Sequence, residues 1–465
     1  MPNLERTLYV KKKNYNMPGC KRRTNNKEVN LGLTEEMAVQ ESHRCLDCAN
    51  PTCVTGCPVN VNIPKFIKKI EAKDFLGAAS VIKETSTLPA VCGRVCPQEK
   101  QCESQCFYTQ KLKKPAVAIG YLERFAADYE RESGKMSIPE CEKPNGIKVA
   151  AIGSGPASLA WAADMARKGY DVTVFEALHE IGGVLKYGIP EFRLPNAIVD
   201  VEIENLRKMG VHFQTDVIVG KSITTDELEA QGFKGIFVAS GAGLPNFMNI
   251  PGENLINIMS SNEYLTRVNL MDAANPKTDT PINLGKNVLV VGGGNTAMDS
   301  CRTAKRLGAN VTLVYRRSEQ EMPARLEEVK HAKEEGITFL TLHNPVEYLG
   351  DEKGAVQQAV LEVMKLGEPD ASGRRSPEPT GEKITIDVDQ VVVAIGVSPN
   401  PLVPKSIQGL ELGRKNTIAV NEGMQSSRSN IYAGGDIVRG GATVILAMGD
   451  GRNAAKNMDE MLKNN

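Results

Sequence analysis

The feature that most constrains this chain is a strand–turn–helix–strand unit that occurs twice. The first copy spans residues 147–176. After its first apolar strand, Gly153 and Gly155 predict a tight turn whose backbone can approach a pyrophosphate. A helix begins at Pro156 and Ala157, and its N-terminus points to the same phosphate. The unit therefore predicts a Rossmann-like dinucleotide-binding fold.

The end of this first copy indicates which dinucleotide it binds. Residues 171–175 predict the second strand, and Glu176 follows it, 23 residues after Gly153. A carboxylate at that distance can accept hydrogen bonds from a ribose. The first unit is therefore predicted to bind FAD, with a purely structural glycine turn as the alternative.

The second copy, residues 287–315, repeats the first at a constant offset of 139. Gly292 and Gly294 take the places of the two turn glycines, and Asn295 and Thr296 begin the helix. The repeated spacing predicts a second dinucleotide site in a second Rossmann-like domain.

The two copies differ where the second strand ends. Tyr315 stands where the first copy has its carboxylate, and Arg316 and Arg317 follow. Loss of the carboxylate removes repulsion against a 2′-phosphate, which two guanidinium groups can bind through charge-assisted hydrogen bonds. The second unit is therefore predicted to bind NADP(H) rather than NAD(H), with a solvated arginine pair as the alternative. The segment that follows, ending in Arg325, is predicted to complete the phosphate pocket.

Cysteines gather before the first glycine unit. Eight of the eleven lie between residues 45 and 106, in two runs that each contain a Cys-Pro pair. Closely spaced cysteines followed by Cys-Pro are typical of ferredoxin-like [4Fe–4S] sites, in which the last cysteine of a run often serves the other cluster. Zinc is the competing interpretation, because its sites also use Cys-x2-Cys.

Composition excludes several other classes. The 465 residues leave room for about three domains, and the formal net charge of zero gives no support to nucleic-acid binding. No apolar run approaches the ~20 residues that span a bilayer, and the N-terminus lacks the apolar core of a signal peptide. A cytoplasmic protein that does not bind membranes is therefore predicted. Residues 1–30 are basic and polar, and they are predicted to form a solvated tail rather than a docking site for an acidic partner.

The cysteine block, both glycine units and the segment 430–455 together resemble the glutamate synthase small (β) subunit family. That family includes the N-terminal part of dihydropyrimidine dehydrogenase. It also includes the large subunit of the NADH-dependent reduced ferredoxin:NADP⁺ oxidoreductase, an electron-bifurcating enzyme. The resemblance covers about residues 34–465.

The resemblance implies two [4Fe–4S] clusters. The first would be held by Cys45, Cys48, Cys53 and Cys106. The second would be held by Cys57, Cys96 and Cys102, with Glu123 as its fourth ligand. The sequence alone also permits Cys92 in that fourth position, and Glu123 is the preferred assignment.

Further residues are expected at the flavin. Gly183 permits close approach of the backbone, and by resemblance Arg193 contacts the flavin, where a cation would stabilise its reduced form. Val219 is predicted to touch the adenine. After Gly435, Asp436 can accept a ribityl hydroxyl. The remaining predicted members are Thr443, which starts a last helix aimed at the flavin, and Ala394 and Gly396, where the chain crosses between the nucleotide domains.

The predicted fold class is α/β, with the second nucleotide domain inserted in the first. Residues 1–145 would form a helical cluster domain, 146–245 and 391–465 the FAD domain, and 246–390 the NADPH domain. No Cys-x2-Cys or Cys-x4-Cys pair follows Glu176, so electrons are expected to leave through the clusters rather than through a redox disulfide.

The predicted function is electron transfer between NADP(H), FAD, the clusters and a partner subunit. Hydride would pass between the nicotinamide and the flavin, with no protein acid–base group required. The expected partner is either a glutamate synthase large subunit or a small flavin/[2Fe–2S] subunit of an electron-bifurcating ferredoxin:NADP⁺ oxidoreductase, and ferredoxin itself is a further candidate. A non-catalytic, nucleotide-binding redox sensor is the alternative from another class.

Overall fold

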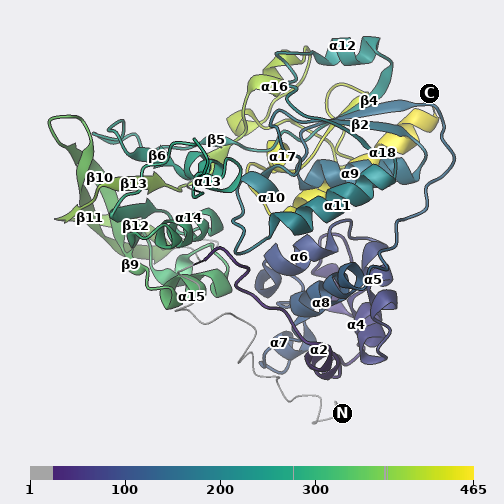
Figure 1. Ribbon diagram of the computed structural model, residues 1–465, viewed down its shortest axis with the longest axis horizontal. Helices are drawn as coiled ribbons and strands as arrows, with labels where there is room; N and C mark the ends of the chain where they lie inside the picture. Colours follow the sequence, from purple (N-terminus) through teal and green to yellow (C-terminus); the bar gives the residue numbers. More distant parts are fainter. Residues whose placement is uncertain (1–24, 276, 371–372, 374, 465) are drawn as a thin grey trace.

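The computed structural model describes residues 25–464, except 276, 371, 372 and 374 (Figure 1). Most of the predicted basic tail therefore lies outside the described residues. The rest forms a helical part and two α/β parts, and the predicted fold class is confirmed. Among the described residues, no helix combines the length and the apolar character needed to cross a membrane.

The helical part comes first in the chain. Its helices are α2 (Glu35–Ser42), α3 (Thr52–Thr55), α4 (Ile63–Glu71), α5 (Phe75–Lys83), α6 (Pro89–Val95), α7 (Phe107–Gln110) and α8 (Ile119–Glu132), with a 3-10 turn η2 (Gln98–Lys100). Apolar residues recur with helical spacing over residues 63–82, but the structure divides this stretch between α4 and α5. The division occurs because the Asp74 carboxylate accepts a hydrogen bond from the Gly77 amide (2.9 Å) and so caps a new helix.

The first sheet has the strand order β15-β4-β1-β2-β3, and all its neighbours are parallel. Its members are β1 (Lys148–Ile152), β2 (Asp171–Phe175), β3 (His212–Gln214), β4 (Phe233–Val238) and β15 (Ile431–Ala433). Strand β15 comes from the end of the chain, so this domain is discontinuous. The helices α9 (Pro156–Arg167) and α18 (Val444–Lys463) pack against each other, as Figure 1 shows.

The second sheet has the order β6-β13-β7-β8-β9 and is also parallel. Its strands are β6 (Ile258–Ser260), β7 (Asn287–Val291), β8 (Asn310–Tyr315), β9 (Thr338–Thr341) and β13 (Gln390–Val393), and its helices are α13 (Ser261–Asn269), α14 (Asn295–Arg306) and α15 (Leu326–Glu334). The predicted domain boundary between residues 390 and 391 falls inside β13, which belongs wholly to this sheet.

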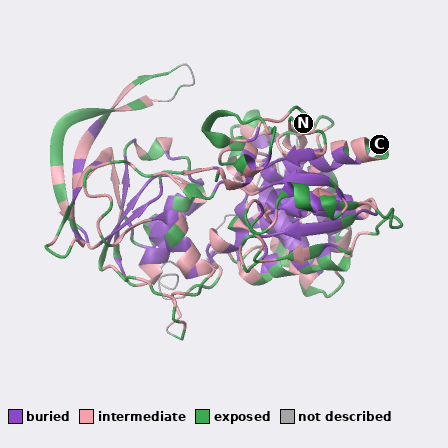
Figure 2. Cartoon of the chain, turned by 90° about the horizontal axis from the view of Figure 1, so that it is seen from above, coloured by how far each residue is buried: buried purple, intermediate pink, exposed green. Residues whose placement is uncertain are grey.

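An exposed antiparallel sheet extends from this domain (Figure 2). It contains β10 (His343–Gly350), β11 (Val356–Pro369) and β12 (Arg375–Asp387). Within the polar segment 367–382, residues 367–369 belong to β11 and residues 375–382 to β12. Two short strands, β5 (Leu244–Pro245) and β14 (Val397–Ser398), pair where the chain leaves and re-enters the first domain. The remaining short elements are α10 (Val184–Tyr187), α12 (Thr225–Ala230), η3 (Glu319–Glu321), α16 (Leu402–Ser406), η4 (Arg414–Asn416) and α17 (Asp436–Arg439).

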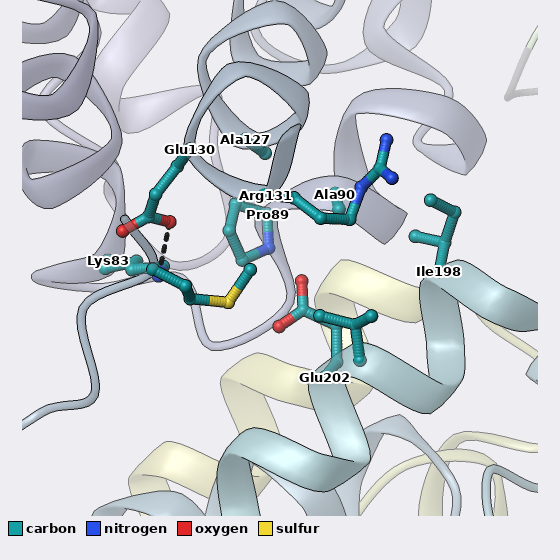
Figure 3. A pocket seen from close by; sticks show the side chains of 10 residues that line it. Lys83, Pro89, Ala90, Ala127, Glu130, Arg131, Ile198 and Glu202 are labelled. Carbon is teal, nitrogen blue, oxygen red and sulfur yellow. Dashed lines mark ion pairs between the residues drawn. The ribbon is translucent and has the colours of Figure 1, made fainter. Parts of the chain in front are cut away.

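The helical part and the first α/β domain share one apolar core. Buried residues from α4, α8 and α9, among them Phe66, Leu122 and Trp161, belong to the same contiguous cluster. On this interface, residues of α11 (Asn196–Lys208) and of α5, α6 and α8 line a small cavity of about 10 Å³. Figure 3 shows Glu202 among these residues, together with the Lys83–Glu130 ion pair. The shared core holds the predicted cluster ligands close to the predicted FAD site.

Candidate functional site

The first glycine turn has the geometry that a bound pyrophosphate needs. Gly153 has φ +93°, and a Cβ there would lie 2.5 Å from the carbonyl oxygen of Ala239 at the end of β4. Gly155 is the N-cap of α9, and a Cβ built on it would meet no atom of the described chain within 4 Å. The turn is therefore tightly packed on one side and open on the other, with the first amide N–H groups of α9, from Ala157 onward, at the open side.

Glu176 is held at this turn by its own hydrogen bonds. Its Oε2 accepts from the Ser154 amide (2.8 Å) and hydroxyl (2.5 Å), and its Oε1 accepts from the Leu178 amide (2.9 Å). The Ser154 hydroxyl in turn accepts from the Gly182 amide (3.0 Å). The buried carboxylate thus joins the glycine turn to the loop that was predicted to lie along the flavin.

That loop closes over the same turn. Gly183 has φ +55°, and a Cβ on it would lie 3.0 Å from the Cα of Gly155, so only glycine fits. Tyr187 follows in α10. Burial raises the pKa of its hydroxyl to about 12, and the nearby carboxylates of Asp436 and Glu176 add to the shift. Three predicted flavin segments therefore converge, although they are separated by as many as 260 residues along the chain.

The C-terminal segment completes this convergence. Gly435 has φ +75°, and its amide donates to the Asp450 carboxylate (3.0 Å). Burial raises the pKa of Asp436, whose Oδ1 accepts from the Ala442 amide (3.0 Å). Thr443 is the N-cap of the 20-residue helix α18, and its hydroxyl accepts from the Leu446 amide (3.3 Å). The positive end of this helix favours negative charge near Asp436 and Thr443.

Two predicted flavin residues have other contacts in this structure. The Arg193 guanidinium donates to both carboxylate oxygens of Asp299 on α14, at 2.7 and 2.6 Å, so it ties the first α/β domain to the second. Val219 is only 2% exposed and packs in the core beside Ile152 and Phe175. The contacts of Arg193 with the flavin and of Val219 with the adenine stay predictions.

The second glycine turn repeats the first in three dimensions. A Cβ on Gly292, at φ +142°, would overlap the carbonyl oxygen of Ala394 at the end of β13. Gly294 caps α14 and borders open space, as Gly155 does, and Thr296 in the first turn is exposed. Gly396 has φ +112°, and its carbonyl oxygen accepts a hydrogen bond from the Asn246 amide (3.1 Å). This bond lies where the two segments that connect the nucleotide domains run side by side. The two glycine units therefore also match in their contacts with the ends of β4 and β13, at Ala239 and Ala394.

The two arginines after β8 have different surroundings. Arg316 is exposed, whereas Arg317 is buried and its Nε donates to the carbonyl oxygen of Arg375 (2.9 Å) in the hairpin. Arg375 donates to Glu321 (2.8 Å). The hairpin therefore borders the region predicted to bind the 2′-phosphate. Arg325 was predicted to complete that pocket, but its side chain turns away toward the helical domain.

The first predicted set of cluster ligands comes together in the structure. Burial raises the pKa of the Cys53 thiol to about 12, and repulsion from Cys106, Cys45 and Cys48 adds to this effect. Burial likewise raises the pKa of Cys48, with Cys106 as the next contribution. These four sulfurs come from two segments about 50 residues apart, so their proximity results from the tertiary fold.

The second predicted set also converges. Burial is the main cause that raises the pKa of Cys57 to about 11, and Glu123 and Cys96 contribute to the same shift. Burial raises the pKa of Cys102, with contributions from Glu123, Cys96 and Cys57. Glu123 itself is buried, and this burial raises its pKa to about 8. Cys92 lies in the same group, with its thiol against the Met448 sulfur (3.5 Å).

Close helix packing makes this second convergence possible. A Cβ on Gly93 would lie 2.6 Å from the Arg124 amide nitrogen, so α6 and α8 are in backbone contact beside Glu123.

Among the described residues, no three potential ligands are close enough to hold a single metal ion. The two sets of thiols, buried or half-buried, stay the predicted ligands of thiolate-bound [4Fe–4S] clusters.

Several residues at this site were not predicted from sequence. Ser154 and Asp450 hold Glu176 and the Gly435 turn by hydrogen bonds. Ser240, at the end of β4, has a buried hydroxyl without a hydrogen-bond partner in the described chain, as expected beside a ligand. Ser240 could have been predicted only from its position after a strand that ends at the glycine turn. Nothing in the sequence near Asp450 indicates that its carboxylate binds the Gly435 amide.

Comparison with known families agrees with this geometry. Residues 22–135 match the family described as dihydropyrimidine dehydrogenase domain II, 4Fe-4S cluster. Residues 147–451 match the pyridine nucleotide-disulphide oxidoreductase family. The fold and the site thus define a flavin- and pyridine-nucleotide-dependent oxidoreductase with an iron–sulfur domain.

Relatives narrow the class further. The small chain of glutamate synthase [NADPH] from Azospirillum brasilense is 35% identical over 455 residues, which cover 96% of this chain and 93% of that protein. The same small chain from Escherichia coli is 35% identical, over 94% of each chain. The NADPH-Fe(3+) oxidoreductase subunit beta of Geobacter sulfurreducens is 35% identical, over 90% of this chain and 65% of that protein. The chain belongs to the glutamate synthase small-chain family, and the predicted resemblance is confirmed.

Solved structures support the fold. Mycobacterium tuberculosis FprA in complex with NADPH aligns with a TM-score of 0.59 at 22% identity, over 69% of this chain and 85% of that chain. Lactococcus lactis thioredoxin reductase aligns with a TM-score of 0.53 at 24% identity, over 69% of this chain and all of that one. This chain is an NADPH-dependent FAD/iron–sulfur oxidoreductase of the glutamate synthase small-chain type.

Proposed function

We propose that this chain holds two [4Fe–4S] clusters and passes electrons between NADP(H), FAD, these clusters and a partner subunit. The convergence of two separate groups of buried cysteines beside the predicted FAD site carries the proposal. Bound flavin would supply hydride transfer, and bound clusters would supply single-electron transfer. The protein's own contribution is to position these groups and to set their electrostatic surroundings.

The chain's residues have separable roles in this proposal. Cys45, Cys48, Cys53 and Cys106 hold one cluster, and Cys57, Cys96, Cys102 and Glu123 hold the other. The open amides at Gly155 and Gly294 bind the two pyrophosphates. The dipole of α18 and the Arg193 side chain favour negative charge on the flavin.

The Arg193–Asp299 ion pair, at 2.6 Å, supports a fixed relation between the two nucleotide domains. Both side chains are nearly excluded from solvent, so separating the domains would leave each charge without its partner. A fixed orientation suits hydride transfer, which requires the two reacting atoms to be held in close and constant alignment.

A partner subunit is part of the proposal. Relatives of this chain are named as the small chain of glutamate synthase and as beta subunits of an NADP(+)-dependent formate dehydrogenase and an NADPH-Fe(3+) oxidoreductase. The two partners considered are a glutamate synthase large subunit and a small flavin/[2Fe–2S] subunit, with ferredoxin as a further electron carrier. Copurification with an amidotransferase-sized chain would support the first, and with a smaller flavin- and iron-containing chain the second.

The decisive experiment is analysis of the protein purified without oxygen. Two [4Fe–4S] clusters and one FAD per chain are expected, together with NADPH-dependent reduction of a one-electron acceptor such as ferricyanide. A protein that binds FAD but contains no iron or sulfide would overturn the cluster assignment. Full cofactor content without reduction of this acceptor by NADPH would instead favour the redox-sensor alternative.

A further inference from the structure

One short segment of the NADPH domain contacts both the nucleotide turn and the loop that carries the second set of predicted cluster ligands. We call residues 323–327, which run from the loop after η3 into the first turn of α15, the bridging segment. On its nucleotide side, the Ala324 amide donates to the carbonyl of Gly293 (3.1 Å), and the Arg325 amide donates to Oδ1 of Asn295 (2.9 Å). Gly293 and Asn295 belong to the glycine turn and to the first turn of α14.

On its other side, the bridging segment is bound to the helical domain. The Arg325 guanidinium donates through Nη1 to the carbonyl of Arg94 (2.9 Å) and through Nη2 to Oε1 of Gln98 (2.8 Å). Arg94 lies two residues before Cys96 and Gln98 lies two residues after it. The guanidinium therefore donates hydrogen bonds to the chain on both sides of a predicted ligand. Lys100 adds a bond from its ammonium group to the carbonyl of Pro323 (2.8 Å).

Gln98 extends this contact to the neighbouring turn of α6. Its Nε2 donates to the carbonyls of Cys92 (3.3 Å) and Gly93 (3.4 Å). A side chain on Gly120 of α8 would overlap the Gln98 amide, so Gln98 is enclosed on that side as well. The Arg325 contact is therefore part of the framework that positions the second set of predicted ligands.

The Arg325 cation is also buried, with an exposed fraction of 6%. Burial acts against its charge, but the carboxylates of Glu327 and Glu99 and, more weakly, the Cys96 sulfur outweigh this effect, and the pKa of the guanidinium is raised. Glu99 lies 3.5 Å from Nε and Glu327 lies 3.6 Å from Nη2. Without Arg325, these two acids would lose the cation that lies between them beside the ligand loop.

We propose that Arg325 is a positioning residue that sets the reduction potential of the second cluster and links it to occupancy of the NADP(H) site. This inference rests on the proposed function, because it requires the second cluster. Reduction adds one negative charge to a cluster, and a buried cation near a ligand stabilises that charge. Because Asn295 holds the Arg325 amide, a nucleotide that binds at the start of α14 acts on the same segment.

Coupling of this kind is reciprocal. If NADP⁺ changes the reduction potential of the second cluster, then reduction of that cluster changes the affinity for NADP⁺ by the same factor. The bridging segment would therefore report the redox state of the clusters to the nucleotide site.

The test is an EPR-monitored redox titration of both clusters, with and without NADP⁺, in the wild-type chain and in R325Q, R325K and K333Q. Lys333 provides the matched control: it is a cation on the same helix, α15, but it is exposed and pairs with Glu319 (2.5 Å). In R325Q we expect the ratio of reduced to oxidised second cluster at a fixed potential to fall at least tenfold, which is 59 mV for a one-electron couple. The first cluster should be unchanged.

R325K separates charge from geometry. A lysine keeps the positive charge but cannot make both hydrogen bonds of the fork, so we expect a smaller shift in potential and a weakened response to NADP⁺. The K333Q protein should titrate as the wild-type protein does. Because R325K preserves the buried charge, it also provides a measurement if R325Q fails to retain its clusters.

Two results would overturn the inference. One is a second-cluster potential that is the same in wild type, R325K and R325Q. The other is a shift of equal size in K333Q, or in the first cluster, which would indicate a general effect of charge or folding. Failure of the proposed function is recognised separately, because the wild-type protein itself would then lack the iron and sulfide of a second cluster.

Discussion

Arg316 and Arg317 were predicted to bind the 2′-phosphate as a pair, and the structure gives them different surroundings. Arg316 is exposed, whereas Arg317 is anchored to the hairpin through the Arg375 carbonyl. We expect R316Q to lower the ratio of kcat/KM for NADPH to that for NADH by about tenfold, because one charge-assisted contact with the 2′-phosphate is lost. Steady-state kinetics with both coenzymes measure this ratio. R207Q, which changes another exposed arginine, is the control, and an unchanged ratio in R316Q would contradict the assignment.

The fourth ligand of the second cluster is a choice between two buried side chains in one group. Glu123 and Cys92 both lie near Cys57 and Cys96. We expect C92A to keep both clusters and E123A to lose the second cluster or change its EPR spectrum, because only Glu123 is assigned as a ligand. Iron content and EPR of both proteins measure this. The reverse result would assign the position to Cys92.

At the scale of elements, the contact between α6 and α8 determines where the second group of ligands lies. A methyl group at Gly93 would press on the backbone of Arg124 at 2.6 Å. We expect G93A to destabilise the helical domain by roughly 1–3 kcal/mol, since overpacked cores must shift. It should also lower the iron content toward that of one cluster, while FAD is retained. Thermal unfolding and iron and flavin assays test this, and full iron content would refute it.

Helix α11 carries a buried acid into the interface of Figure 3. Burial raises the pKa of Glu202 to about 7, although Lys83 opposes the shift. The folded protein therefore holds this proton at pH values where the unfolded chain has released it. The resulting stability is complete below about pH 4.5 and falls as pH rises toward 7. E202Q should remove that slope, worth about 3 kcal/mol, from thermal unfolding measured between pH 5 and 8. An identical slope in E202Q would show that other groups cause it.

At the scale of the whole molecule, the helical domain contacts both nucleotide domains. The second sheet and its flanking helices have apolar clusters of their own, whereas the helical domain shares its core with α9 and α18. We expect cluster removal by a chelator to increase amide hydrogen exchange in residues 34–132 and in the bridging segment, with β7 and β8 still protected. Exchange that rises equally in all three parts would contradict this independence.

Much of the fold could be predicted because its signals are local. The two glycine units gave β1, β2, α9 and their second copies, and β1 and β2 lie within the predicted limits. Two features were not predicted: a helix break whose cause, a capping hydrogen bond, is itself local, and a domain boundary that depends on strand pairing. The helical pattern over 63–82 continues across the cap at Asp74, and β13 belongs to the second sheet because it pairs with β6 and β7.

The amino-acid sequence by itself determined the class of chemistry through two dinucleotide units and two runs of cysteine, and the residues after β8 predict the coenzyme preference. These features depend on spacing within about 30 residues, where backbone geometry leaves few choices. Only the tertiary structure decided that β15 returns beside β4, that Asp450 holds Gly435, and that Arg325 reaches Gln98 rather than the phosphate pocket. Such contacts join segments far apart in the chain, and packing and charge pairing select them only after the domains have come together.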